Sequence, residues 1–212
     1  MSASPQMLGL RERSKLRRVD RILQAARDLL REGGGDVPTV EQVAERAEVA
    51  TATVFNLVGT RENLWAALAN EALAELEERV KALPDVDPHK RARRIVAMTV
   101  DLICADAAVN RAVLLHWHES GRLLRHGPTR ELLRCLEAAA AARTIRADID
   151  RRRLSEMIAV ACTGAVHQWA AGLIDDRTFK RRCRTAVDLV FAAAARTDEA
   201  QSGFLADLER RA

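Results

Sequence analysis

The chain has 212 residues, of which 48% are hydrophobic and only 3% aromatic, with no tyrosine. This length and apolar content suit one large helical domain, or a small domain joined to a larger one, and they exclude a wholly disordered chain. Ala, Leu, Arg and Glu dominate the composition, which favours helix throughout and leaves few candidates for strands. We therefore predict an all-α protein. The net charge of +4 says little about partners by itself.

The positive charge is concentrated near the N-terminus. From Leu10 to Arg27 there are seven lysines and arginines against two acids. We predict that residues 1–16 form a flexible basic arm. Such an arm either meets a polyanion or is only a solvated tail, and charge alone does not separate the two.

Several classes of protein are disfavoured. The four cysteines are far apart, with no C-x-x-C and no histidine at ligand spacing, so we expect buried free thiols, a reducing cytoplasm and no metal site. The first 30 residues lack the apolar run of a signal peptide. No stretch approaches the roughly 18 uncharged apolar residues of a membrane span. We expect a cytoplasmic protein that does not enter a membrane.

The N-terminal part of the chain predicts a helix that Gly33–Gly35 ends, followed by two short helices. The apolar stripe of the first helix has the i, i+3, i+4, i+7 spacing of one buried face. Thr39 and Gln42 form a capping box at the start of the second helix. The third covers roughly residues 50–57, and Thr60 is placed to cap a long fourth helix that runs to about Leu83.

Two short helices joined by a turn of three or four residues, after a longer helix, are typical of a helix-turn-helix. The three helices can share a small core. One face of the third is then free to enter a DNA major groove, which is about 12 Å wide.

Residues 22–68 resemble the TetR family of regulators. The resemblance is carried by the stretches ILQAARDLL, TVEQVAERA and TATVFNLVGTRENL at family spacing. The chain departs from the family pattern at Glu48, where the turn usually has Gly, and at Ala50, where a capping Ser is usual. Phe55 stands in place of the usual Tyr, and Val58 in place of Phe. The resemblance implies a helix-turn-helix domain over residues 17–66 and a helical ligand-binding and dimerisation domain over 67–212.

The resemblance also assigns roles at the DNA. Thr39 and Arg61 match positions that commonly hold the DNA backbone, although Thr39 could only cap its helix and Arg61 could be only a solvated charge. Thr51, Thr53 and Asn56 lie on the recognition helix as candidates for base edges or nearby phosphates, with burial against the first helix as the alternative for Thr53. An Asn can pair with both N6 and N7 of adenine. The full expected set is Thr39, Thr51, Thr53, Phe55, Asn56, Arg61, Arg17 and Arg18.

Beyond the linker at residues 84–88 the pattern predicts helices over 89–106, 109–118, 129–142, 150–173 and 178–195, then a weaker segment. Helices 150–173 and 178–195 are apolar on more than one side. A helix with so broad an apolar surface is buried on two sides. We expect the second side to meet a partner subunit, which agrees with the four-helix dimer interface of TetR-like proteins.

The second half has no motif for catalysis or for a cofactor, so we predict that the protein is not an enzyme. His116 and His118 point about 200° apart on a helix and cannot share a metal. Trp117 is either core or a stacking wall for a ligand. By analogy with the family, the residues expected to line an effector pocket are Met98, Leu102, Trp117, Leu133, Ile158 and Cys162.

The sequence thus predicts a homodimeric, DNA-binding transcriptional regulator without a cofactor. Its expected partners are double-stranded operator DNA and a small apolar or amphipathic effector that releases it, as a repressor. A DNA-binding scaffold of the same fold, without an effector, is the alternative.

Overall fold

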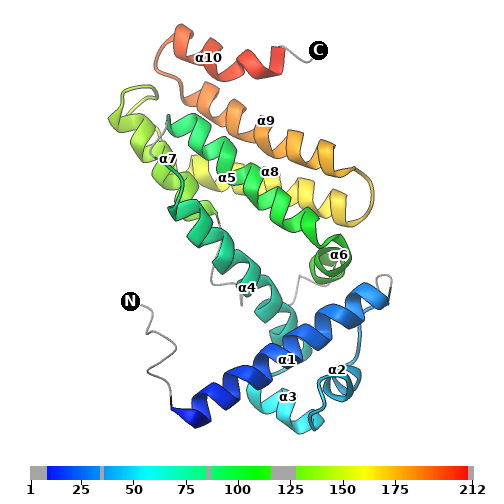
Figure 1. Ribbon diagram of the computed structural model, residues 1–212. Coiled ribbons are helices and arrows are strands. Elements are labelled where there is room, and N and C mark those ends of the chain that lie inside the picture. Colours follow the sequence, from blue (N-terminus) through cyan, green and yellow to red (C-terminus); the bar gives the residue numbers. More distant parts are fainter. Residues whose placement is uncertain (1–8, 34–35, 85–86, 116–127, 210–212) are drawn as a thin grey trace. The chain divides into compact units, whose positions relative to one another are not determined.

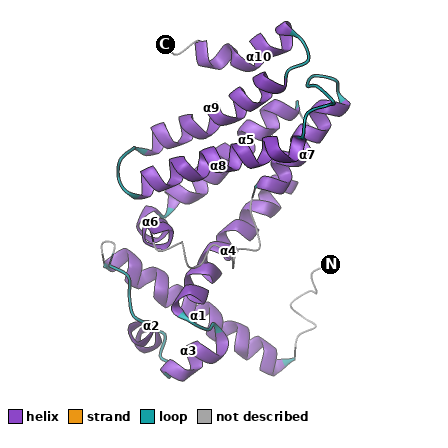
Figure 2. Ribbon diagram, turned by 180° about the vertical axis from the view of Figure 1, so that it is seen from behind, coloured by secondary structure: helices purple, strands orange, loops and turns teal. Residues whose placement is uncertain are grey.

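The computed structural model describes residues 9–33, 36–84, 87–115 and 128–209. Within those ranges every regular element is an α-helix, ten in all (Figures 1 and 2). The expected all-α class with an N-terminal helix-turn-helix is confirmed. The chain forms two compact units, one containing the residues up to Glu71 and most of α6, the other containing 72–107 and the rest of the chain from 125.

The first unit is built from α1 (Leu10–Glu32), α2 (Val40–Arg46), α3 (Thr51–Leu57), the first part of α4 (Arg61–Lys81) and α6 (Ala107–Leu115). Its core brings together apolar side chains from all of these helices. The fully or almost fully buried members include Leu30, Val43, Val54, Leu64 and Val113. A shared core fixes the angle between two helices that are each only seven residues long, too short to be stable alone.

Local capping positions these short helices as the sequence predicted. Thr39 Oγ1 accepts from the backbone N–H of Gln42 at 3.2 Å, and the side-chain Oε1 of Gln42 accepts from the N–H of Thr39 at 2.8 Å. The capping box is confirmed. At the start of α4, Asn63 Oδ1 accepts from both the backbone N–H (3.0 Å) and the hydroxyl (2.9 Å) of Thr60.

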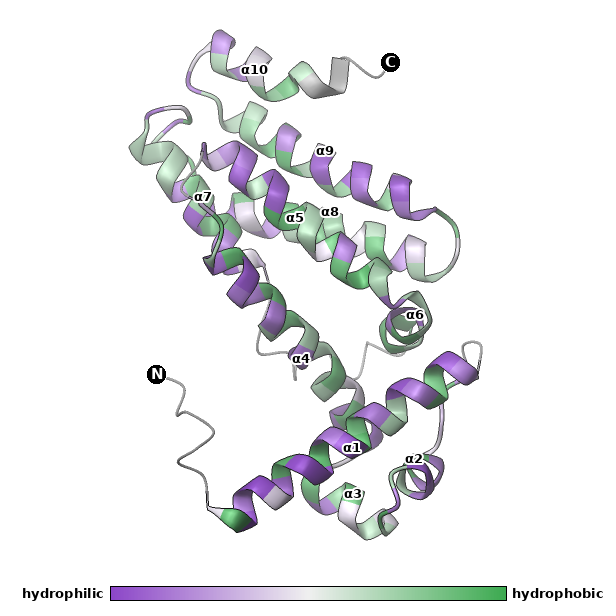
Figure 3. Cartoon of the chain, in the orientation of Figure 1, coloured by the Kyte–Doolittle hydropathy of each residue, from purple (hydrophilic) through white to green (hydrophobic). Residues whose placement is uncertain are grey.

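Helix α1 begins at Leu10, so residues 10–16 are helical and the expectation of a flexible arm over 1–16 is wrong for them. Residues 1–8 lie outside the described part of the chain. The side chains of residues 10–18 are all exposed, so no buried stripe marks this stretch, and α1 is mostly hydrophilic in Figure 3. Arginine, lysine and leucine are nevertheless good helix formers, which lets the buried half of α1 continue outward.

The second unit contains the end of α4 together with α5 (Pro88–Ala105), α7 (Thr129–Ala141), α8 (Arg151–Ala170), α9 (Asp176–Ala194) and α10 (Asp198–Glu209). Aspartate side chains cap three of them at the N-terminus: Asp87 caps α5, Asp150 caps α8 and Asp175 caps α9. Both ribbon views show α8 and α9 antiparallel and side by side, joined by a short turn (Figures 1 and 2).

The predicted helices beyond the linker agree with α5 to α9 to within a few residues at most ends. The C-terminal segment expected to be weaker is the 12-residue helix α10. The expected boundary between residues 66 and 67 falls inside α4. Helix α6 groups with the first unit, although the expected second domain, 67–212, contains it. None of the described helices combines the length and the hydropathy needed to cross a bilayer.

Candidate nucleic-acid interface

The recognition helix α3 has one buried and one free face. Val54 is fully buried in the core, whereas Ala52, Phe55 and Asn56 are exposed, Phe55 to 48%. Residues i, i+3 and i+4 share a helix face, so these three form one surface, which we call the α3 outer face. A free face on the second helix of a helix-turn-helix is the surface that reads DNA bases in such motifs.

The predicted contact residues of α3 divide between this face and its edges. Asn56 and Phe55 lie on the α3 outer face, and Thr51 and Thr53 are half-buried at its sides. The backbone N–H of Thr53 bonds to the carbonyl of Ala50 at 2.8 Å. Ala52 was not among the predicted contacts, although its spacing from Phe55 and Asn56 could have found it. Alanine has no hydrogen-bonding side chain, so only its spacing from Phe55 and Asn56 marks Ala52.

The turn before α3 has an unusual backbone. Glu48 adopts φ +54°, a left-handed conformation that a side chain disfavours and that glycine adopts freely. The N–H of Val49 then reaches the carbonyl of Ala44 at 3.0 Å, closing the end of α2. The turn therefore has the geometry that a glycine normally provides, with a glutamate in its place.

Thr39 and Arg61 stand at the start of α2 and α4. Thr39 is exposed, so a hydroxyl that caps its helix is also open to solvent. Arg61 is the first residue of α4 and is half-buried. Helix N-termini favour anions because their backbone N–H groups lack partners within the helix. Both positions are compatible with phosphate contact.

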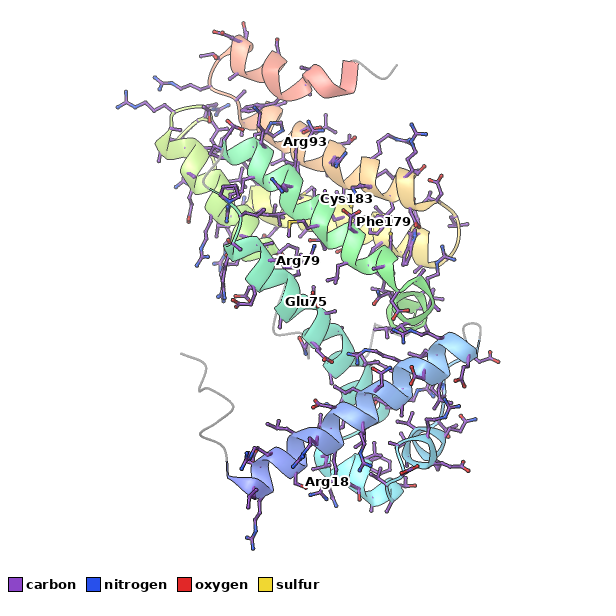
Figure 4. The ribbon with its side chains drawn as sticks, viewed as in Figure 1. Arg18, Glu75, Arg79, Arg93, Phe179 and Cys183 are labelled. Carbon is purple, nitrogen blue, oxygen red and sulfur yellow. The ribbon has the colours of Figure 1, made fainter. Side chains whose placement is uncertain are left out.

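Arg17 and Arg18 lie on α1 and not on a flexible arm. Both are exposed, and with Arg11, Ser14 and Arg21 they share one side of the helix, which we call the α1 basic stripe (Figure 4 labels Arg18). The helix-turn-helix itself is acidic, because residues 36–65 contain five acids and two arginines.

One of those two arginines, Arg46, is paired with Glu32 at 2.7 Å, and this hydrogen bond holds the pKa of the Glu32 carboxyl below its usual value. If this unit binds DNA, the charges available to phosphates are mainly those of the α1 basic stripe and Arg61.

In the second unit, α8 and α9 expose apolar side chains on the surface away from their core. Met157 and Val160 of α8 are 57% and 63% exposed, and Leu189 of α9 is 52% exposed. Gly164 lies on the same side of α8, and a Cβ added there would meet no atom within 4 Å. We call this surface the α8–α9 outer face. It is the second apolar side that the sequence predicted for these helices.

The expected effector residues fall on three helices of the second unit. Ile158 is fully buried on α8, whereas Met98 and Leu102 on α5, Leu133 on α7 and Cys162 on α8 are half-buried. Trp117, like His116 and His118, lies outside the described residues. A cavity of about 490 Å³ lies elsewhere in this unit, against α5, α9 and α10, and none of the five described candidates lines it.

All four cysteines are free, as expected, but only Cys135 and Cys183 are buried, and Cys104 and Cys162 are half-buried. Burial is the main cause that raises the pKa of the Cys104 and Cys135 thiols to about 11. A hydrogen bond from the Cys183 thiol lowers the pKa of Cys162, and the same bond raises that of Cys183. In the described part of the chain no three His, Cys, Asp or Glu side chains are grouped to hold a metal ion.

No protein-family model matches the chain. The chain is 29% identical over 199 residues to the HTH-type transcriptional regulator BetI of Burkholderia ambifaria (strain MC40-6), covering 88% of this chain and 98% of that protein. Among solved structures, the fatty acid degradation regulator FadR from Bacillus halodurans has a TM-score of 0.64 at 18% identity, covering 88% and 96% of the two chains. A TetR-family regulator from Rhodococcus sp. has a TM-score of 0.61 at 18% identity, covering 82% and 98%.

The fold and the free face of α3 define a helix-turn-helix transcription regulator. The chain is similar over most of its length to TetR-family transcriptional regulators, as residues 22–68 indicated. This is a family of regulators without enzymatic activity, which confirms the prediction that the protein is not an enzyme.

Proposed function

We propose that the protein is a cytoplasmic, homodimeric repressor that binds a palindromic operator and is released by a small apolar or amphipathic effector. The observation that carries the proposal is the α3 outer face, where an exposed amide and an exposed aromatic ring stand over a fully buried Val54. A helix anchored on one side and free on the other can enter a major groove without disturbing its core.

Within this proposal the residues have distinct roles. Asn56 reads a base edge, Phe55 and Ala52 pack on base or sugar carbons, and Thr51 and Thr53 contact at the sides. Thr39, Arg61, Arg17 and Arg18 hold phosphates, which positions α3 without reading sequence.

Dimerisation is supported by the α8–α9 outer face. Exposed Met157, Val160 and Leu189 would be costly to leave in water and are suited to a self-complementary contact. A two-fold axis places two recognition helices on successive major-groove faces, about 34–36 Å or a multiple apart, and so requires a palindrome.

The effector is expected among α5, α7 and α8, where Met98, Leu102, Leu133 and Cys162 are half-buried and largely apolar. Such a lining favours a ligand whose surface is mainly carbon. An effector releases DNA only if it binds one conformation of the dimer better than the DNA-bound one.

The test is a footprint of the protein on its own upstream DNA, repeated with a library of metabolites. We expect one protected palindrome whose protection is lost with a particular small molecule. Dispersed protection that no compound relieves would favour a DNA-binding scaffold instead.

The Asn56→Ala variant makes the test specific. The substitution should reduce the binding free energy at the operator by roughly 1–3 kcal/mol. It should also relax the preference for one base at one position of each half-site. The Arg152→Ala variant, which removes an exposed arginine of the second unit, is the matched control and should bind as the wild type. Equal losses on operator and random DNA for Asn56→Ala would show that Asn56 contacts a phosphate.

A further inference from the structure

The cavity of the second unit is lined by an excess of positive charge. Four cationic side chains face it: Lys90, Arg93 and Arg94 from α5, and Arg184 from α9. The remaining wall includes His89 of α5 and two small residues of α10, Gly203 and Ala206. We call this the α5–α10 groove, and Figure 4 labels Arg93 on its α5 side.

A buried acid beside the lining residues is already engaged. Asp188 of α9 is 1% exposed and its Oδ1 lies 2.7 Å from Nε2 of His89 and 3.6 Å from Nε of Arg93. The ring of His89 is held in turn against Phe191 and Phe204. This carboxylate is engaged by His89 and Arg93, and it forms no ion pair with Lys90, Arg94 or Arg184.

The other three cations have no acidic partner within the described ranges. Neither Lys90, Arg94 nor Arg184 forms an ion pair or a side-chain hydrogen bond there, whereas other cations of the same unit do. Lys180, for example, pairs with Asp101, and Arg146 lies 3.0 Å from Asp148. Like charges gathered in a concave site repel one another and raise the local concentration of anions.

The groove also has room for a ligand. Its volume of about 490 Å³ falls within the usual range of small-molecule sites, about 300–1,000 Å³. A Cβ added at Gly203 would meet no atom within 4 Å, so this side of the groove is open space and not packed protein.

We propose that the α5–α10 groove binds a small, multiply charged oxyanion, such as an organic phosphate or a polycarboxylate. Arginine guanidinium groups from two different helices can each donate paired hydrogen bonds to such an oxyanion. The ligand bridges α5 and α9 beside α10, and its binding therefore stabilises the second unit. The site is separate from the expected effector pocket, since none of the described pocket candidates lines it, and it does not rest on the proposed function.

The test measures binding of two probes, inorganic pyrophosphate and citrate, to the full chain by isothermal titration calorimetry at constant ionic strength and without DNA. We expect saturable binding of at least one probe with one site per chain. Tighter binding of pyrophosphate assigns the site to phosphates, and tighter binding of citrate assigns it to carboxylates.

Two charge variants and one bulk variant locate the site. Arg94→Met and Arg184→Met should each weaken binding about tenfold, the loss of a charge-assisted hydrogen bond. Gly203→Leu should weaken it similarly without changing charge, because a leucine at this lining position has open space to fill in the groove. The controls are Arg177→Met, an exposed arginine at the start of α9, and Ser202→Leu on the exposed side of α10. Both should bind as the wild type, and circular dichroism checks that each variant is folded.

Several results would overturn the proposal. One is the absence of saturable binding by either probe. Another is a loss of affinity in Arg177→Met equal to that in Arg94→Met and Arg184→Met, which would mean that binding depends only on the overall charge. A third is unchanged affinity in Gly203→Leu, which would place the anion outside the groove. Because these measurements contain no DNA, they fail or succeed independently of operator binding.

Discussion

At the scale of single residues, the turn between α2 and α3 contains a strained backbone conformation that the rest of the fold stabilises. Glu48 has φ +54° because the turn must redirect the chain within a few residues and bring α3 onto the core. A left-handed conformation costs a non-glycine residue roughly 1–2 kcal/mol. The surrounding core, with Val43 and Val54 fully buried on either side of the turn, holds the residue there.

Replacing Glu48 by glycine should therefore stabilise the protein. Removal of the backbone strain outweighs the extra entropy of glycine in the unfolded chain, which is roughly 0.5–1 kcal/mol, so we expect a net gain of about 0.5–1 kcal/mol. Urea unfolding followed by circular dichroism measures it. Glu45→Gly, the same change in the right-handed backbone of α2, is the control and should destabilise by a similar amount. A loss of stability in both variants would contradict the strain at Glu48.

The reactivity of each cysteine thiol is a second property that depends on the residues around it. The pKa of Cys104 is raised from 9.0 to about 11, so at neutral pH its thiolate fraction is about a hundredfold smaller than that of an ordinary thiol. The pKa of the half-buried Cys162 is lowered by its bond from Cys183. We expect iodoacetamide to modify Cys162 first and Cys104 slowly, although the two are similarly exposed.

Peptide mapping by mass spectrometry after brief labelling checks this order. Cys162→Ser should remove the fast phase and leave the slow one. Labelling of Cys104 ahead of Cys162 would refute the assignment.

At the scale of elements, α1 combines two functions along its length. Its second half supplies Ile22, Ala26 and Leu30 to the core, and its first half is exposed on all sides and carries the α1 basic stripe. Because the stripe is on a helix continuous with the core, its charges have a fixed direction relative to α3. That arrangement suits phosphate contact better than a free tail, because less conformational entropy is lost on binding.

The double variant Arg17→Ala/Arg18→Ala should weaken binding to operator and random DNA alike. For each arginine that neutralises a phosphate, its removal should reduce the slope of log K against log salt by about 0.9. Fluorescence anisotropy over a range of salt concentrations measures the slope. Arg152→Ala provides the control at the same protein concentration, and an unchanged slope in the double variant would show that the two arginines are only solvated.

At the scale of the whole molecule, the exposed apolar side chains of α8 and α9 are a property of the pair of helices and not of either alone. Trp169 and Phe179 stack with ring centroids 5.7 Å apart and fix α8 against α9 on the inner side. Met157 and Val160 of α8 and Leu189 of α9 are left exposed. A second copy of the same surface is the simplest cover for it.

Gly164→Trp tests that surface. The position is exposed and open, so the substitution should leave the protomer folded while the indole overpacks a close helix crossing. We expect a helical monomer that has lost most of its operator affinity, as seen by analytical ultracentrifugation, circular dichroism and a gel shift on one sample.

Glu137→Trp, at an exposed position of α7, is the control for added bulk and should remain dimeric. A Gly164→Trp variant that remains dimeric would indicate that α9, and not α8 at Gly164, forms the main part of the dimer interface. A wild type that sediments as a monomer at micromolar concentration, yet protects a palindrome, would contradict the dimer altogether.

The features that depend on local physics could be predicted from the amino-acid sequence alone. Apolar periodicity located nine of the helices within the described residues, since one buried face repeats every 3.6 residues. The Thr39–Gln42 capping box needed only residues three apart, and the helix-turn-helix followed from short helices in a fixed order.

Features that join distant residues depend on how the helices pack and could not be predicted from local spacing. The outward face of α3 depends on how Val54 packs into a core shared by five helices, and this decides which of Ala52, Thr53 and Asn56 is exposed. A helix of seven residues has too few positions for its apolar pattern to fix its rotation about its own axis. The pairing of His89 with Asp188, 99 residues away, and the grouping of α6 with the first unit have no signal in local spacing. The α5–α10 groove arises for the same reason: its cations come from separate helices, and only packing makes them neighbours.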